Sequence, residues 1–177
     1  SWEDMSARYT SELANGLGNL ASRATAMIEK YCEGSVPAPA GYTAADAALQ
    51  ELLVSTVTKA DACYLALDFA GGIGAVKEFV DAVNLYVTEQ EPWKVAKDES
   101  QTILYVIAES LRAIAVLHHA VMPRATSLIW EQIGAAELGD IAGQRVQDAG
   151  AWGLLPAGAR VDKGEILFPR LVDPDES

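Results

Sequence analysis

The sequence predicts an all-α fold, a bundle of about five helices with an irregular C-terminal tail. Apolar residues recur every three or four positions over most of residues 1–135, which is the period of an amphipathic helix. No segment alternates with period two for long enough to form a sheet strand, and long helices with short links predict antiparallel neighbours. We therefore divide the chain into a helical bundle, residues 1–135, and a tail, residues 136–177, expected to pack on the bundle or on another domain.

The first helix is predicted from Ser1 to about Glu33. Ser1 is a candidate N-cap, because a serine side chain can accept hydrogen bonds from the free amides of the first turn. Gly34 is a typical C-terminal stop, and the prolines at positions 37 and 39 prevent the helix from continuing. The apolar side of this helix consists of Met5, Tyr9, Leu13, Leu17, Leu20, Ala24, Met27, Ile28 and Tyr31.

A second helix is predicted from Thr43, a candidate cap, to about Leu67. Asp68 is the next candidate cap, and the apolar pattern that follows predicts a third helix that Pro92 ends. Three glycines near its start weaken the first turn by up to about 1 kcal/mol each. They are Gly71, Gly72 and Gly74.

A fourth helix is predicted to open at Asp98 or Ser100, to carry one apolar side and to break at Pro123. A short fifth helix is predicted over about Ala125 to Ile133. From Gly134 onward the chain is rich in glycine and proline and loses a clear period, which is typical of irregular structure.

Composition sets limits on function. The chain has 177 residues, enough for one domain whose core needs neither disulfides nor metals. Its 13 Lys and Arg against 25 Asp and Glu give a net charge of −12, which argues against a protein that grips nucleic acid through phosphates. That argument holds unless base contacts dominate here and phosphate contacts lie elsewhere in a longer chain.

No apolar run approaches the ~18 residues of a membrane span, so we expect a cytoplasmic protein with Cys32 and Cys63 reduced and no membrane partner.

No catalytic residue and no metal-ligand set is predicted. His118 and His119 are adjacent, so on a helix they point about 100° apart and cannot easily share a metal ion. His118 falls on the flank of the apolar side and His119 points away from it. The glycine-rich segment Gly71–Gly74 lacks the strand before it and the Lys-Ser/Thr after it that a phosphate loop needs, which favours a role in helix packing or helix start.

Two polar features are candidates for binding nucleic acid. Asn19 and Arg23 are four residues apart and so lie one above the other at the border of the apolar side. An amide and a guanidinium in this arrangement can read a base edge, although such a pair is also typical of an ordinary helix surface. Pro92 and Trp93 follow the third helix beside Lys94 and Lys97. The indole is either a platform on which a base stacks or a cap on the bundle core.

Four segments carry a resemblance to a known family. They are Leu17 to Arg23 (LGNLASR), Asn84 to Lys97 (NLYVTEQEPWKVAK), Leu111-Arg112, and Val121 to Pro123 (VMP). In this order and at these separations they resemble methionyl-tRNA synthetases of the bacterial type. The resemblance covers about residues 1 to 135.

The resemblance implies a class I aminoacyl-tRNA synthetase. In that family a Rossmann-like catalytic domain joins methionine to tRNA(Met) with ATP and Mg²⁺, and in some members it holds structural zinc. Neither signature motif of that domain occurs here, so we expect a fragment without activity or cofactor of its own. The implied partners are the anticodon loop of tRNA(Met) and the parent's own catalytic domain, with no DNA partner.

The resemblance also implies roles for particular residues. By motif position, Asn19 and Arg23 hydrogen-bond to bases of the CAU anticodon, and Trp93 stacks on the anticodon loop with support from Pro92. The two motifs would then supply complementary halves of one base-reading pocket. Asn84 also matches an asparagine of the family, for which a structural role fits equally well.

The sequence departs from the family pattern at Glu91, which places a carboxylate near RNA where many relatives have a small residue. The tail shows no sign of an appended RNA-binding or dimerisation module, and Phe168 and Leu171 are expected to pack on the catalytic domain. The alternative function is a helical protein–protein interaction module without RNA binding, for which an exposed Trp93 would also be suited.

Overall fold

A computed structural model describes residues 2–164, without the side chains of residues 2–6 and 9. The helices are α1 (Trp2–Cys32), α2 (Ala44–Leu65), α3 (Phe69–Gln90), α4 (Lys97–His118) and α5 (Pro123–Gln132), followed by η1 (Ala135–Leu138), η2 (Ile141–Gly143) and the short α6 (Val146–Ala149). The described residues form no strand, which confirms the all-α prediction. The expected N-cap at Ser1 and the expected contacts of Phe168 and Leu171 lie outside the described residues.

Local capping chemistry places most helix ends where the sequence predicts them. Thr43 and Asp46 form a reciprocal capping box at the start of α2, and Asp68 accepts a hydrogen bond from the Gly71 amide at the start of α3. Gly34 adopts the left-handed conformation just beyond α1, with φ +75°. Two helices begin earlier than expected. α4 opens after Ala96, without a side-chain cap, and α5 opens at Pro123 itself, because proline suits the first helical position.

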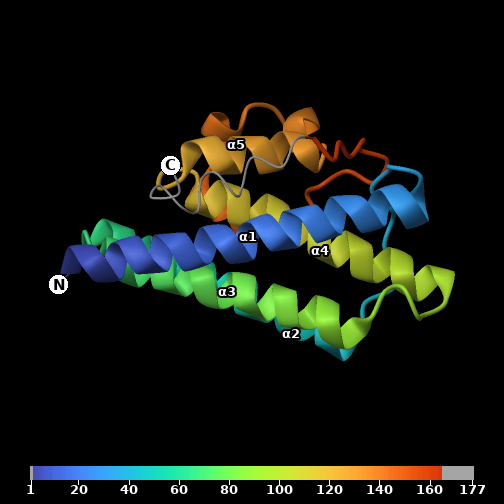
Figure 1. Cartoon of the computed structure of the whole chain (residues 1–177), viewed down its shortest axis with the longest axis horizontal. Helices are drawn as coiled ribbons and strands as arrows, with labels where there is room; N and C mark the ends of the chain where they lie inside the picture. The colour runs from blue at the N-terminus through green and yellow to red at the C-terminus, as the bar shows by residue number, and fades with distance from the viewer. Residues whose placement is uncertain (1, 165–177) are drawn as a thin grey trace, which may run out of the picture.

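Successive helices alternate in direction, as Figure 1 shows, so the odd-numbered α1 and α3 run parallel and lie side by side. Two contacts give their register: Lys77 Nζ lies 3.7 Å from Glu12 Oε2, and Asn19 Nδ2 donates to Asn84 Oδ1 at 3.4 Å. Both pairs are separated by 65 positions, since 77 − 12 and 84 − 19 give the same number. The two motifs of the sequence therefore lie on one pair of parallel helices.

α4 is the central helix of the bundle. Every residue from Thr102 to His118 is buried, whereas the sequence predicts a helix with one apolar side. The difference arises because α1, α2, α3, α5 and the tail all pack around α4. By length and composition this helix could also cross a membrane, but 94% of its apolar window is buried inside the protein, as expected of a core helix.

The segment after α5 packs on the bundle through polar contacts to α4. Tyr105 donates to the Leu155 carbonyl at 2.9 Å, and the Leu155 amide donates to Glu109 at 2.7 Å. Farther along, the Val36 amide donates to the Ala159 carbonyl at 2.9 Å, which ties the α1–α2 connection to the tail. The division of the chain at residue 135 stays a prediction.

The glycine-rich start of α3 is a packing feature. A Cβ on Gly72 would overlap the ring of Tyr64 on α2, so this position accepts only hydrogen. Gly71 and Gly72 therefore serve helix start and packing, whereas a Cβ on Gly74 would meet nothing within 4 Å. Cys32 and Cys63 are both free, as expected.

Candidate nucleic-acid interface

The Asn19 motif lies where α1 and α3 meet. Asn19 is exposed and Arg23 is half-buried, so both reach solvent from one side of α1. Asn84 on α3 donates to the Gly16 carbonyl at 3.1 Å and accepts from Asn19 at 3.4 Å. Asn84 therefore links the two helices and orients the Asn19 amide, whose carbonyl oxygen remains available to a ligand.

The Trp93 motif follows a sharp turn at the end of α3. Glu91 takes the left-handed conformation with φ 46°, and the Lys94 amide donates back to the Glu91 carbonyl at 2.9 Å. Pro92 is buried in this turn, and Trp93 leaves it with 43% of its surface exposed. That exposure contradicts the reading in which Trp93 caps the core, and it leaves a ring face open for stacking.

The cavity beside Trp93 does not include the Asn19 motif. Trp93 and Pro92 line a cavity of about 300 Å³ with Tyr31 and Cys32, at the end of α1, and neither Asn19 nor Arg23 lines it. Arg23 and Tyr31 are eight residues apart on α1, which is about 12 Å along the helix. That the two motifs together form one base-reading pocket stays a prediction.

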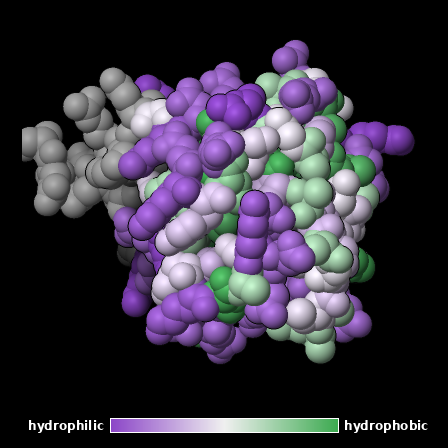
Figure 2. Space-filling model, turned by 90° about the vertical axis from the view of Figure 1, so that its right-hand side faces the viewer, coloured by the Kyte–Doolittle hydropathy of each residue, from purple (hydrophilic) through white to green (hydrophobic). Residues whose placement is uncertain are grey.

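Three lysines, Lys30, Lys94 and Lys97, lie near Tyr31 and Trp93 in a chain with a net charge of −12. Lys30 lies over the Tyr31 ring, with Nζ 5.4 Å from its centroid. Lys94 pairs with Glu91 at 3.1 Å, which compensates locally for the acidic departure from the family pattern. Lys97 makes no ion pair with any residue in the described range 2–164. Figure 2 shows the end of the molecule where α1 and α3 end, and hydrophilic residues dominate it.

Tyr31 is a surface residue that the apolar pattern of the first helix does not predict. The pattern places Tyr31 on the apolar side, but 39% of it is exposed, beside Lys30. The available signal was its place in the last helical turn, where α1 extends beyond the packed core. Gln101, which lines the cavity next to Lys97, carried no signal in the sequence.

His118 ends α4 and His119 follows it. Among the described residues no group of three His, Cys, Asp or Glu side chains could hold a metal ion. His118 is fully buried rather than at the flank of an apolar side, and burial lowers its pKa to about 4. His119 contacts the Thr126 hydroxyl through Nδ1 at 2.8 Å. Both histidines therefore serve packing.

Comparisons with known proteins agree with this geometry. Residues 36–177 match the family model described as the anticodon binding domain of methionyl tRNA ligase. The methionine–tRNA ligase of Streptomyces coelicolor is 54% identical over 180 residues, which cover 97% of this chain and 34% of that protein. The methionine–tRNA ligase of Halalkalibacterium halodurans is 38% identical over 170 residues, covering 93% of this chain and 25% of that protein.

Solved structures agree as well. The apo methionyl-tRNA synthetase of Mycobacterium tuberculosis superposes with a TM-score of 0.79 at 30% identity, covering 96% of this chain and 34% of that one. The chain spans about a third or less of the length of these relatives. The matches confirm the resemblance and give no support to a protein–protein interaction module. The chain belongs to the family of anticodon-binding domains of methionyl-tRNA ligases.

Proposed function

We propose that this domain reads the CAU anticodon of tRNA(Met) through Asn19, Arg23 and Trp93. The observation that carries the proposal is that Asn19 and Trp93 are exposed and Arg23 is half-buried, on α1 and just beyond the end of α3, in a chain of this family. Pro92 fixes the turn that presents Trp93. Asn84 acts through Asn19, because it holds that amide at 3.4 Å.

Each side chain has a chemistry that suits its role. Arg23 offers up to five donors in a planar fork, and Asn19 offers an amide acceptor whose donor side is held by Asn84. Together they can distinguish base edges by donor and acceptor pattern. The Trp93 indole can stack on any base, at about 1–3 kcal/mol per base, so it supplies affinity while the polar pair supplies specificity.

In this proposal, the charging of tRNA(Met) with methionine is carried out by a longer parent protein that contains this domain. A structure of the Mycobacterium tuberculosis relative contains methionyl-adenylate, and this chain matches it with a TM-score of 0.78. We infer a cytoplasmic parent that uses ATP and Mg²⁺ to charge tRNA(Met) with methionine. The present domain would position the tRNA and contribute no catalytic residue.

The test compares binding of this chain to an anticodon stem-loop bearing CAU and to one with a changed first base. We expect a preference for CAU, which Arg23→Ala abolishes with the fold intact, whereas Trp93→Ala weakens both complexes and leaves the preference. Phe69→Ala is the matched control, since Phe69 is 45% exposed at the opposite end of α3.

Equal binding of the two stem-loops by this chain and by the full-length ligase would refute the anticodon-reading role. Unchanged RNA binding in Arg23→Ala would instead favour the protein–protein alternative. Circular dichroism of each variant checks that the helices remain folded.

A further inference from the structure

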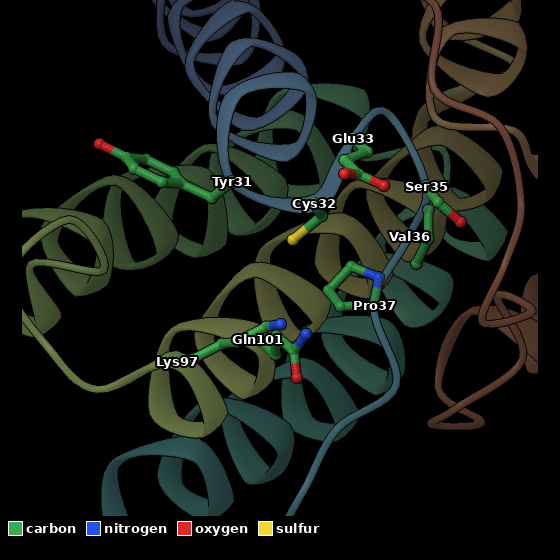
Figure 3. A pocket seen from close by; sticks show the side chains of 8 residues that line it. All are labelled: Tyr31, Cys32, Glu33, Ser35, Val36, Pro37, Lys97 and Gln101. Atoms are coloured by element: carbon green, nitrogen blue, oxygen red, sulfur yellow. The ribbon is translucent and has the colours of Figure 1, made fainter.

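A groove runs beside Trp93 between the end of α1 and the start of α4. It consists of two adjoining cavities of about 300 and 330 Å³ that share Tyr31, Cys32, Lys97 and Gln101. Each volume is at the lower end of the range for small-molecule sites. We call this feature the α1–α4 groove. Figure 3 shows Cys32, Lys97 and Gln101 turned toward its interior.

The floor of the groove offers hydrogen-bond donors that nothing in the described chain uses. Ser100 lines the cavity beside Trp93, is only 8% exposed, and its hydroxyl has no partner within residues 2–164. The Gln101 amide also has none in that part of the chain. The Ser100 hydroxyl is not a fully buried atom, so it can hydrogen-bond to a ligand or to solvent in the cavity.

The charges around the groove favour an anion on the Trp93 side. Lys97 stands at the first position of α4, and no side chain caps this helix start. The Ser100 amide makes the first helical hydrogen bond, to the Ala96 carbonyl, so the amides of residues 97–99 precede the helical ladder. The acidic Asp98 and Glu99 are exposed and do not line the groove.

The side of the groove away from Trp93 is lined by different residues. Glu33, Ser35 and Pro37 line only the cavity on that side, so the one carboxylate of the groove lies there and not beside Trp93, although Lys97 lines both cavities. Burial raises the pKa of the Cys32 thiol, against a smaller opposing effect of Lys97, so the thiol between the two cavities is uncharged at neutral pH. A ligand that is anionic at one end and carries hydrogen-bonding edges at the other matches this polarity.

We propose that the α1–α4 groove binds one further nucleotide of the anticodon loop, adjacent to the nucleotide that stacks on Trp93. Its phosphate would lie at the start of α4 against Lys97 and Ser100. Its base would enter the groove past Tyr31 and meet the Gln101 amide. The inference rests on the proposed function, because it extends the path of the RNA along the same surface.

The first test measures how salt weakens binding of the CAU stem-loop. Neutralising one phosphate of a single strand contributes a slope of about 0.7 in log K against log salt. We expect Lys97→Gln to reduce the slope by this amount and Lys59→Gln, which removes an exposed lysine from α2, to leave it unchanged. A slope equal to that of the unmodified chain in Lys97→Gln would overturn the inference.

The second test uses the natural cysteines. Bound stem-loop should slow alkylation of Cys32 in the groove and not of Cys63, which lies on α2. The measurement is then repeated with an abasic nucleotide immediately before or after the anticodon. We expect one of these two RNAs to bind without protecting Cys32. If both protect it fully, or if even intact RNA fails to, no base occupies the groove.

The anticodon-reading role and the additional nucleotide site can be refuted independently of each other. Loss of CAU preference in the unmodified chain and in full-length ligase refutes the anticodon-reading role itself. A retained CAU preference, together with unprotected Cys32 or an unchanged salt slope in Lys97→Gln, refutes only the additional nucleotide site.

Discussion

Arg112 is expected to be the most sensitive stabilising residue of the bundle. It is fully buried in the middle of α4 and pairs with Glu109, whose Oε1 lies 2.6 Å from Arg112 Nε. The guanidinium also donates to the carbonyls of Ala151 at 2.8 Å and Asp148 at 3.2 Å. Glu109 in turn accepts from the Leu155 amide at 2.7 Å. The pair thus connects the central helix to the tail.

Arg112→Met preserves most of the side-chain volume and removes the charge. The variant leaves Glu109 buried without its cation and leaves two tail carbonyls without donors. Removing one partner of a buried ion pair costs about 3–5 kcal/mol. A domain of this size has about 5–15 kcal/mol in total, so we expect the variant to be folded but marginal.

The loss of folding free energy in Arg112→Met should depend on pH. Burial raises the pKa of Glu109 above its usual 4.5, and Arg112 and the Leu155 amide oppose that shift. Without Arg112 the folded-state pKa rises further, so the penalty is absent below the unfolded pKa and grows as pH rises toward neutrality. The difference between the two proteins should therefore be largest at neutral pH and smallest near pH 4.5.

Urea denaturation at neutral and acidic pH measures these free energies of unfolding. Arg124→Met, which alters an exposed arginine on α5, is the control and should change stability by no more than about 0.5 kcal/mol. Adding Glu109→Gln to Arg112→Met should recover part of the loss. A loss below about 1 kcal/mol for Arg112→Met at neutral pH would refute the reasoning, since it would mean that the pair offers no net support over an apolar side chain.

Two further predictions concern buried positions. His118 has a pKa lowered by burial to about 4 from 6.5, so the stability linked to its neutral form is present above pH 6.5 and is lost as pH falls toward 4, by about 3 kcal/mol in all. His118→Leu should remove this part of the acid sensitivity in urea titrations, and identical pH dependence in both proteins would contradict the assignment. Gly72→Ala should lose about 1–3 kcal/mol in thermal or urea unfolding, because its Cβ would overlap the Tyr64 ring. Gly74→Ala, whose Cβ meets nothing within 4 Å, should instead gain up to about 1 kcal/mol, and the same sign for both would contradict the packing account.

Helix ends could be predicted from the sequence because capping is local chemistry. Thr43 and Asp68 accept from amides three residues ahead, so their effect does not depend on the rest of the fold. The burial of α4 on all sides could not be predicted in the same way. Its sequence still carries Glu109, Arg112 and His118, and only the arrangement of the surrounding elements shows that these polar side chains lie inside.

In the candidate site, too, the features that depend on local sequence could be predicted, and those that depend on the arrangement of the helices could not. The shared side of Asn19 and Arg23 follows from helix periodicity alone. The contact between Asn19 and Asn84, 65 positions apart, requires the parallel register of α1 and α3, which no local pattern encodes. The placement of Trp93 beside the end of α1, where it lines a cavity with Tyr31 and Cys32, depends on the same register.

The acidic composition is consistent with reading bases rather than holding phosphates. Few lysines and arginines line the RNA-facing surface, and the net charge of −12 repels a polyanion that makes only backbone contacts. In the proposed function, base contacts at Asn19, Arg23 and Trp93 supply most of the favourable energy, and those of Asn19 and Arg23 depend on the correct anticodon. A non-cognate loop loses the contacts of the polar pair and keeps the repulsion, so it binds weakly, while the ratio of the two affinities is set by the base contacts. The domain should accordingly bind with a shallow salt dependence, to which Lys97 contributes one of the few phosphate contacts.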